Sequence, residues 1–165
     1  MHPQQMSHPV SGKEVVGFLQ PMLVDLIALV LSAKQAQWHA YGRHLTAIDQ
    51  RLERLVADAG RAADQVARRM VTLGMPVDGR LATVATTTSL PELATGFAGE
   101  DKAVSSIIDQ IDAAVARARN ALGPLDRIDQ VSHRILVRVL EGLEKYRWEF
   151  FAQVAAEPTA ARADS

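Results

Sequence analysis

The chain has 165 residues, enough for one domain with a sizeable core and short for two. Only 10 glycines and 7 prolines, with abundant Ala, Leu and Val, favour helices over sheets. A net charge of −1 provides no overall basic field that would draw the chain to nucleic acid. The absence of cysteine excludes disulfides and thiolate metal sites and fits a reducing compartment, so we expect a cytoplasmic location.

The first predicted helix begins near Val15 or Gln20 and ends at Ala40. Pro21 is tolerable only in a first helical turn, because proline lacks the backbone N–H that the helix interior needs. The apolar run in this segment is interrupted by Gln20, Pro21 and Asp25. Since a membrane span needs about 20 nearly uninterrupted apolar residues, we interpret the segment as a buried helix of a soluble protein.

The second predicted helix runs from about Arg43 to Leu73, and Gly74 followed by Pro76 ends it. Its apolar residues recur three or four positions apart and form a narrow stripe. The stripe consists of Ile48, Leu52, Leu55, Ala59, Ala62, Val66, Met70 and Leu73. Two long helices joined by a short connection predict an antiparallel bundle.

The segment that follows is irregular. Residues 81–88 are rich in β-branched side chains and could be taken for a strand, whereas Ser89 to Leu93 has the serine cap and early proline of a short helix. A long connection with its own helix indicates a crossover between helix pairs. The third long helix is expected from about Glu100 to Leu122, ended by Gly123-Pro124, and the fourth from about Ile128 to Val154.

The predicted fold is therefore an all-α four-helix bundle with one crossover connection. We divide the chain into a flexible arm over 1–14, the bundle over 15–154 and a disordered tail over 155–165. The arm lacks the basic and apolar regions of a secretory signal.

Charged residues follow one side of the second helix. Asp49 and Glu53 are stacked neighbours, as are Asp64 and Arg68, and the two pairs lie about 16–23 Å apart along the axis. One chain cannot bring both pairs to one metal, but antiparallel helices of two subunits could form a shared site at a two-fold interface. The alternative is an ordinary solvated helix face with a surface Asp64–Arg68 pair.

Other polar candidates carry weaker signals. His39 and His44 are five residues apart and point in different directions, which is typical of surface or helix-end histidines. Trp38 and Trp148 are interpreted as core or interface aromatics. A further cluster stands where the last helix begins, and its acidic members would offset the helix dipole without any functional role. The cluster consists of Asp126, Asp129, His133 and Arg134.

Several motifs together resemble the Dps family, the mini-ferritins of stressed bacteria. They are the run 34–38 (Lys-Gln-Ala-Gln-Trp), the stretch 73–79 after the second helix, residues 83–93 of the connection, and Gly142-Leu143-Glu144-Lys145 with Trp148. The resemblance covers about residues 17–150. It implies a ferritin-like four-helix subunit, a hollow shell of twelve copies, and an iron-storage and detoxification activity under oxidative stress. In that activity Fe²⁺ is oxidised at each two-fold interface and held as ferric iron.

Carried over residue by residue, the family's ferroxidase positions are Gln37, Asp49, Glu53, Asp64 and Arg68. Only Asp64 is the family residue, and Glu53 keeps an aspartate's charge on a longer arm. The two histidines and the distal glutamate of the family are replaced by Gln37, Asp49 and Arg68. Trp38 keeps the tryptophan that follows the first ligand, beside the site.

Arg68 places a permanent cation among the remaining acids. Arginine stays protonated and offers a planar fork to carboxylates, so we predict that Arg68 replaces the metal electrostatically and that the ferroxidase centre is degenerate. If Arg68 swings out, Asp49, Glu53 and Asp64 remain an oxygen-donor site for iron. Iron is thus the expected substrate, and no other cofactor is implied.

The resemblance also bears on the pores and on DNA. Iron enters such shells through three-fold pores lined with acidic residues near the start of the last helix, where this chain has Arg134 beside His133. Asp126 and Asp129 preserve some negative potential, but cation steering is expected to be weaker. The tails carry few lysines or arginines, so we expect little DNA affinity at physiological salt. Three functions stay open: a shell with weakened or lost iron chemistry, which could co-assemble with a competent homologue; an active ferroxidase using hydrogen peroxide; and a DNA-protecting shell without iron chemistry.

Overall fold

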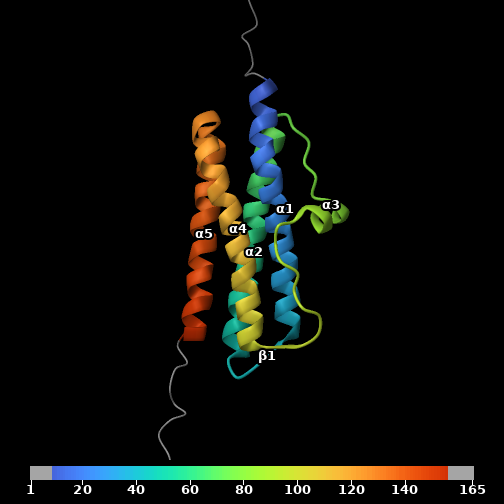
Figure 1. Ribbon diagram of the computed structural model, residues 1–165, viewed down its shortest axis with the longest axis vertical. Helices are drawn as coiled ribbons and strands as arrows, with labels where there is room; N and C mark the ends of the chain where they lie inside the picture. The colour runs from blue at the N-terminus through green and yellow to red at the C-terminus, as the bar shows by residue number, and fades with distance from the viewer. Residues whose placement is uncertain (1–8, 156–165) are drawn as a thin grey trace, which may run out of the picture.

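The computed structural model describes residues 9–155. Four long helices lie side by side as a bundle, and a long connection beside the bundle carries one short helix (Figure 1). The elements in chain order are α1 (Pro9–His39), β1 (Ala40–Tyr41), α2 (Leu45–Thr72), α3 (Leu81–Thr87), β2 (Ala98–Gly99), α4 (Glu100–Ile128) and α5 (Gln130–Ala155). The all-α four-helix prediction with a short extra helix is confirmed. The predictions for residues 1–8 and 156–165 lie outside the described residues.

The core forms where the apolar stripes of the four long helices meet. On α2 the buried positions follow the predicted helical period, with Ala63 buried in place of Ala62. The stretch Gly12–His39 is, by length and composition, apolar enough to cross a membrane. In the structure its large side chains Leu19, Met22, Leu26 and Leu29 are fully buried in the bundle. Burial inside the bundle therefore accounts for its high hydropathy.

Two prolines lie further inside helices than the sequence predicted. α1 begins at Pro9, so Pro21 lies well inside it, and α4 continues through Pro124 to Ile128. An internal proline costs about 3 kcal/mol. Buried side chains flank both sites, Met22 beside Pro21 and Leu125 beside Pro124, each fully buried. Each such burial contributes about 1.5–3 kcal/mol, and several in succession outweigh the proline cost, so the predicted helix ends were wrong.

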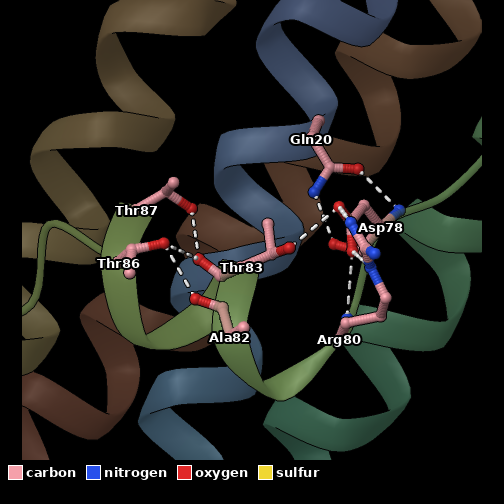
Figure 2. A network of polar contacts seen from close by, with 7 residues as sticks. All are labelled: Gln20, Asp78, Arg80, Ala82, Thr83, Thr86 and Thr87. Carbon is pink, nitrogen blue, oxygen red and sulfur yellow. Dashed lines mark hydrogen bonds and ion pairs between the residues drawn. The ribbon is translucent and has the colours of Figure 1, made fainter.

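The short helix lies at Leu81–Thr87, where a strand had been considered, and residues 89–93 are not helical. Thr86 and Thr87 donate their hydroxyls to backbone carbonyls one turn earlier, at Ala82 and Thr83, so β-branched residues are accommodated in a helix (Figure 2). Ser89 does not cap a helix because its hydroxyl and backbone N–H both donate to Asp25, at 2.6 and 2.8 Å.

A polar network holds α3 against α1 (Figure 2). The Gln20 amide donates to the Asp78 carbonyl oxygen at 2.7 Å and accepts from the Asp78 backbone N–H at 3.0 Å. The Asp78 carboxylate accepts from Arg80 Nε at 2.9 Å and from the Thr83 hydroxyl at 2.8 Å. These side-chain hydrogen bonds, that from Arg80 first, hold the pKa of Asp78 well below its usual range. The side chain therefore remains a charged acceptor that anchors the start of α3.

The end of the bundle after α1 is closed by a two-residue parallel pairing. Ala40 pairs with Ala98 and Tyr41 with Gly99. Beyond the pairing, the Glu100 carboxylate accepts the backbone N–H of His44 at 2.9 Å, and its other oxygen lies 3.4 Å from His44 Nδ1. These contacts fix the turn between α1 and α2, and with it the position of the first residues of α2.

Candidate metal centre

The carboxylates of the predicted site all lie on α2. This helix is continuous from Leu45 to Thr72, so the two acidic groups, Asp49 with Glu53 and Asp64 with Arg68, stay about 16–23 Å apart at 1.5 Å per residue. Within the described residues, no three His, Asp or Glu side chains come close enough to hold a metal ion. Along the described part of one chain, helix geometry therefore keeps the two groups apart.

The four charged side chains of this set have no partners within residues 9–155. Asp49 is half-buried, and Glu53, Asp64 and Arg68 are exposed. None of the four side chains makes a hydrogen bond or ion pair in this part of the chain, so the i,i+4 pair expected between Asp64 and Arg68 is not formed. Both the acids and the arginine are thus available to a neighbouring molecule.

The fifth position, Gln37, is occupied by an interaction that the sequence analysis did not include. Lys34, one helical turn earlier on α1, donates from Nζ to Gln37 Oε1 at 3.0 Å. The amide oxygen is the atom of Gln37 that could bind a cation, and here it accepts from an ammonium group. The i,i+3 spacing of Lys34 and Gln37 was the available sequence signal. Lys34 therefore adds a second positive charge to the set that contains Arg68.

Next to the predicted site, Trp38 is exposed, and the two neighbouring histidines contact residues outside the set. Trp38 is 67% exposed. His39 Nδ1 lies 2.6 Å from Gln35 Nε2, and its ring packs edge-on against Phe97 with centroids 5.5 Å apart. His44 contacts Glu100. The two histidines thus stabilise the end of α1 and the turn that follows, as their spacing suggested.

The residues predicted to line a pore lie around the α4–α5 junction. They differ in whether their side chains are already bound to other residues. Asp129 accepts two bonds from Arg69 Nη2, at 2.9 and 2.8 Å, and also the Ser132 hydroxyl. Asp126 accepts from Gln130 at 2.8 Å and lies 4.0 Å from His133 Nδ1. Arg134 is exposed. The charge of Asp129 is thus compensated by Arg69, so it adds little negative potential for an approaching cation.

Asp129 also sets a pH dependence of stability. Burial alone would raise its pKa, but hydrogen bonds from Ser132 and Arg69 and the Arg69 charge outweigh burial and lower the pKa below 3.8. A group with a depressed folded-state pKa contributes stability above its unfolded-state pKa, and that stability is lost as the pH falls through the folded value.

We expect Asp129→Asn to reduce the free energy of unfolding by about 1–2 kcal/mol at pH 7, with the difference from wild type shrinking below about pH 4. Urea unfolding at pH 7 and pH 3 measures both effects. Asp126→Asn is the matched control on the exposed neighbour, with an expected change within about 0.5 kcal/mol. An equal loss for Asp129→Asn at both pH values would show that its charge is not the source of the stability.

Four long helices and a short helix in the crossover define a ferritin-like subunit of the mini-ferritin class. The Dps of Microbacterium arborescens, solved in its high iron form, is similar with a TM-score of 0.87 and 34% identity over 92% of this chain and 99% of that chain. The Dps92 of Deinococcus radiodurans has a TM-score of 0.86 and 28% identity over 90% of each chain. The chain belongs to the Dps family.

Among curated proteins, DNA protection during starvation protein 2 of Deinococcus radiodurans is 29% identical over 147 residues, 89% of this chain. The chain spans 61% of the length of that relative. The fine tangled pili major subunit of Haemophilus ducreyi is 28% identical over 84% of this chain and 73% of its own length. No family model matches the chain.

Proposed function

We propose that this chain builds a hollow cytoplasmic shell of twelve identical subunits in which iron binding and oxidation at the two-fold interfaces are weakened or lost. The observation that carries the proposal is the occupancy of the five family positions by Gln37, Asp49, Glu53, Asp64 and Arg68. In such a shell, antiparallel α2 helices of two subunits would bring Asp49 and Glu53 of one subunit to Asp64 and Arg68 of its neighbour.

The charge balance of that assembled site supports the proposal. Asp49, Glu53 and Asp64 have no partner within residues 9–155, so they would meet the neighbour's Arg68 as free acceptors. A guanidinium can bind carboxylates through two parallel hydrogen bonds. At an effective dielectric constant of about 20, one charge pair 4 Å apart interacts by about 4 kcal/mol, so Arg68 competes strongly with Fe²⁺ for the same oxygens.

The change of metal-donor atoms is also expected to weaken iron binding. The family site uses imidazole nitrogen, a good ligand for iron, whereas the replacements here offer only oxygen. One of those oxygens, Gln37 Oε1, already accepts from Lys34 at 3.0 Å. A metal at this position would have to displace one cation from the amide and another from the carboxylates. We expect both displacements to weaken iron binding.

An active ferroxidase is the second candidate. It is favoured by the lack of any partner within residues 9–155 that would hold Arg68 beside the carboxylates, and by the freedom of the three carboxylates to coordinate iron with peroxide as the oxidant. A DNA-protecting shell without iron chemistry is third, since the few cations of the tails favour little DNA binding at physiological salt. Co-assembly with a homologous subunit that has an intact centre would give a weakened subunit a structural role.

Asp64→Asn separates the first two candidates. If the centre is closed, the variant and the wild type both oxidise Fe²⁺ no faster than buffer after hydrogen peroxide is added. If the site is active, wild type oxidises iron and Asp64→Asn abolishes the reaction. Asp64 is exposed and has no partner in the described chain, so the free energy of unfolding should change by less than about 0.5 kcal/mol. Loss of fast wild-type oxidation in the variant would contradict the proposal.

A further inference from the structure

A groove between α2 and α5 is lined by none of the five family positions, although its lining residues Arg61 and Gln65 are close in sequence to Asp64. Its volume is about 280 Å³. Its floor is apolar and buried, formed by Leu26 of α1, Leu55 of α2, and Val139 and Leu143 of α5. An apolar floor with a few polar groups at the rim is the usual composition of a small-molecule site.

One wall of the groove is kept open by a glycine inside α5. A Cβ added to Gly142 would meet no heavy atom within 4 Å, so no close approach within the described chain requires glycine there. Glycine in a helix interior costs about 1 kcal/mol relative to alanine. Gly142 lines the groove, and Ala62 stands among the small residues of α2 that line it. The small side chains therefore maintain the cavity at a cost to the helix.

The charges at the rim favour an anion. Asp58 is already compensated, because it accepts hydrogen bonds from the Tyr146 hydroxyl and from Arg61. Arg138 is exposed and, within residues 9–155, makes no hydrogen bond or ion pair. Gln65, also at the rim, has no partner in the same part of the chain. The groove thus presents one uncompensated guanidinium and one free amide above an apolar floor.

We propose that this groove binds a small organic anion with a carboxylate head and an apolar body. The carboxylate would bind Arg138 through the planar fork of its guanidinium, assisted by Gln65. The apolar body would lie against the floor formed by Leu55, Val139 and Leu143 and cover the apolar surface that the groove leaves open. A groove of about 280 Å³ has room for a short acyl chain, so an eight-carbon fatty acid is a suitable probe. A bare inorganic anion would leave the floor uncovered.

Isothermal titration of the purified assembly with octanoate, to about 10 mM ligand, tests the site in the affinity range of so small a molecule. We expect saturable binding of one octanoate per subunit and at least tenfold weaker binding of octanol, which has the same chain without the charge. Arg138→Gln should weaken octanoate binding at least tenfold. Arg134→Gln, one turn away on α5 and outside the lining, should leave it unchanged.

Gly142→Leu should abolish octanoate binding while circular dichroism stays as in wild type and the thermal midpoint is equal or higher, because the new side chain fills open space and glycine is disfavoured inside a helix. If that variant fails to fold, Ala62→Leu fills the groove from α2 and carries the same expectation. No saturable octanoate binding by wild type would overturn the proposal. Unchanged binding by Arg138→Gln would also overturn it, because the carboxylate would then not be recognised by Arg138. Inorganic phosphate binding as tightly as octanoate would overturn it too, because the apolar body would then contribute nothing to binding.

Discussion

Asp25→Ala is expected to lower the free energy of unfolding by about 3 kcal/mol, the largest stability change of any substitution considered for this chain. Asp25 lies on α1 and is fully buried. Its carboxylate accepts the Thr88 hydroxyl at 3.0 Å, the Ser89 backbone N–H at 2.8 Å and the Ser89 hydroxyl at 2.6 Å. Arg117 of α4 also donates to it. One side chain thus joins α1, the crossover connection and α4.

Removing the carboxylate would leave the Arg117 charge, 28% exposed at its side chain, and the Ser89 donors without their acceptor. Breaking one side of a buried ion pair costs more than the pair contributes, because the remaining group stays desolvated. Urea unfolding measures the loss, and hydrogen exchange at Ser89 and Leu90 should accelerate. Asp112→Ala removes the exposed pair with Arg147 and should cost less than about 1 kcal/mol. Equal losses for the two variants would show that Asp25 does not anchor the connection.

Arg68→Glu is expected to have the largest effect on function. It removes the cation and adds a carboxylate at the position where the family has glutamate, so we expect Fe²⁺ affinity to rise at least tenfold. Combined with Gln37→His and Asp49→His, it should produce saturable iron binding and peroxide-dependent oxidation well above the rate in buffer. Anaerobic titration followed by ferric absorbance after peroxide measures both.

Arg138→Glu is the matched control, because it reverses another exposed arginine without a partner in residues 9–155, on α5 and outside the five family positions. It should leave iron binding at the wild-type level. A similar gain from Arg138→Glu would indicate a general electrostatic effect of the assembly. No gain from the triple variant would show that Arg68 and the lost histidines are not what limits iron chemistry.

The bundle itself was predictable because helical periodicity is a local signal. On α2, the predicted stripe and the buried positions agree at Ile48, Leu52, Leu55 and Val66, and the helix ends within two residues of the expected limits. The separation of the Asp49–Glu53 pair from the Asp64–Arg68 pair on α2 followed from helix geometry alone. Both properties depend on residues close in sequence.

The predictions that were wrong concern residues whose structural partners lie far away in the sequence. Pro21 was expected in the first turn of its helix and Pro124 just beyond the end of another, but burial against other helices keeps α1 and α4 continuous through both prolines. Ser89 was expected to cap a helix, but Asp25, 64 residues away, takes its hydroxyl. The groove depends likewise on how α2 and α5 face one another. Such partners cannot be identified from one sequence, because tertiary packing overrides local preference.

The most direct test of the closed-centre account is an anaerobic Fe²⁺ titration of the wild-type assembly, followed by hydrogen peroxide and measurement of ferric absorbance. The account predicts no saturable iron binding at the two-fold interfaces and oxidation no faster than that of iron in buffer. Saturation near one or two irons per interface with fast oxidation would contradict it, and would show that Arg68 yields the site to the metal.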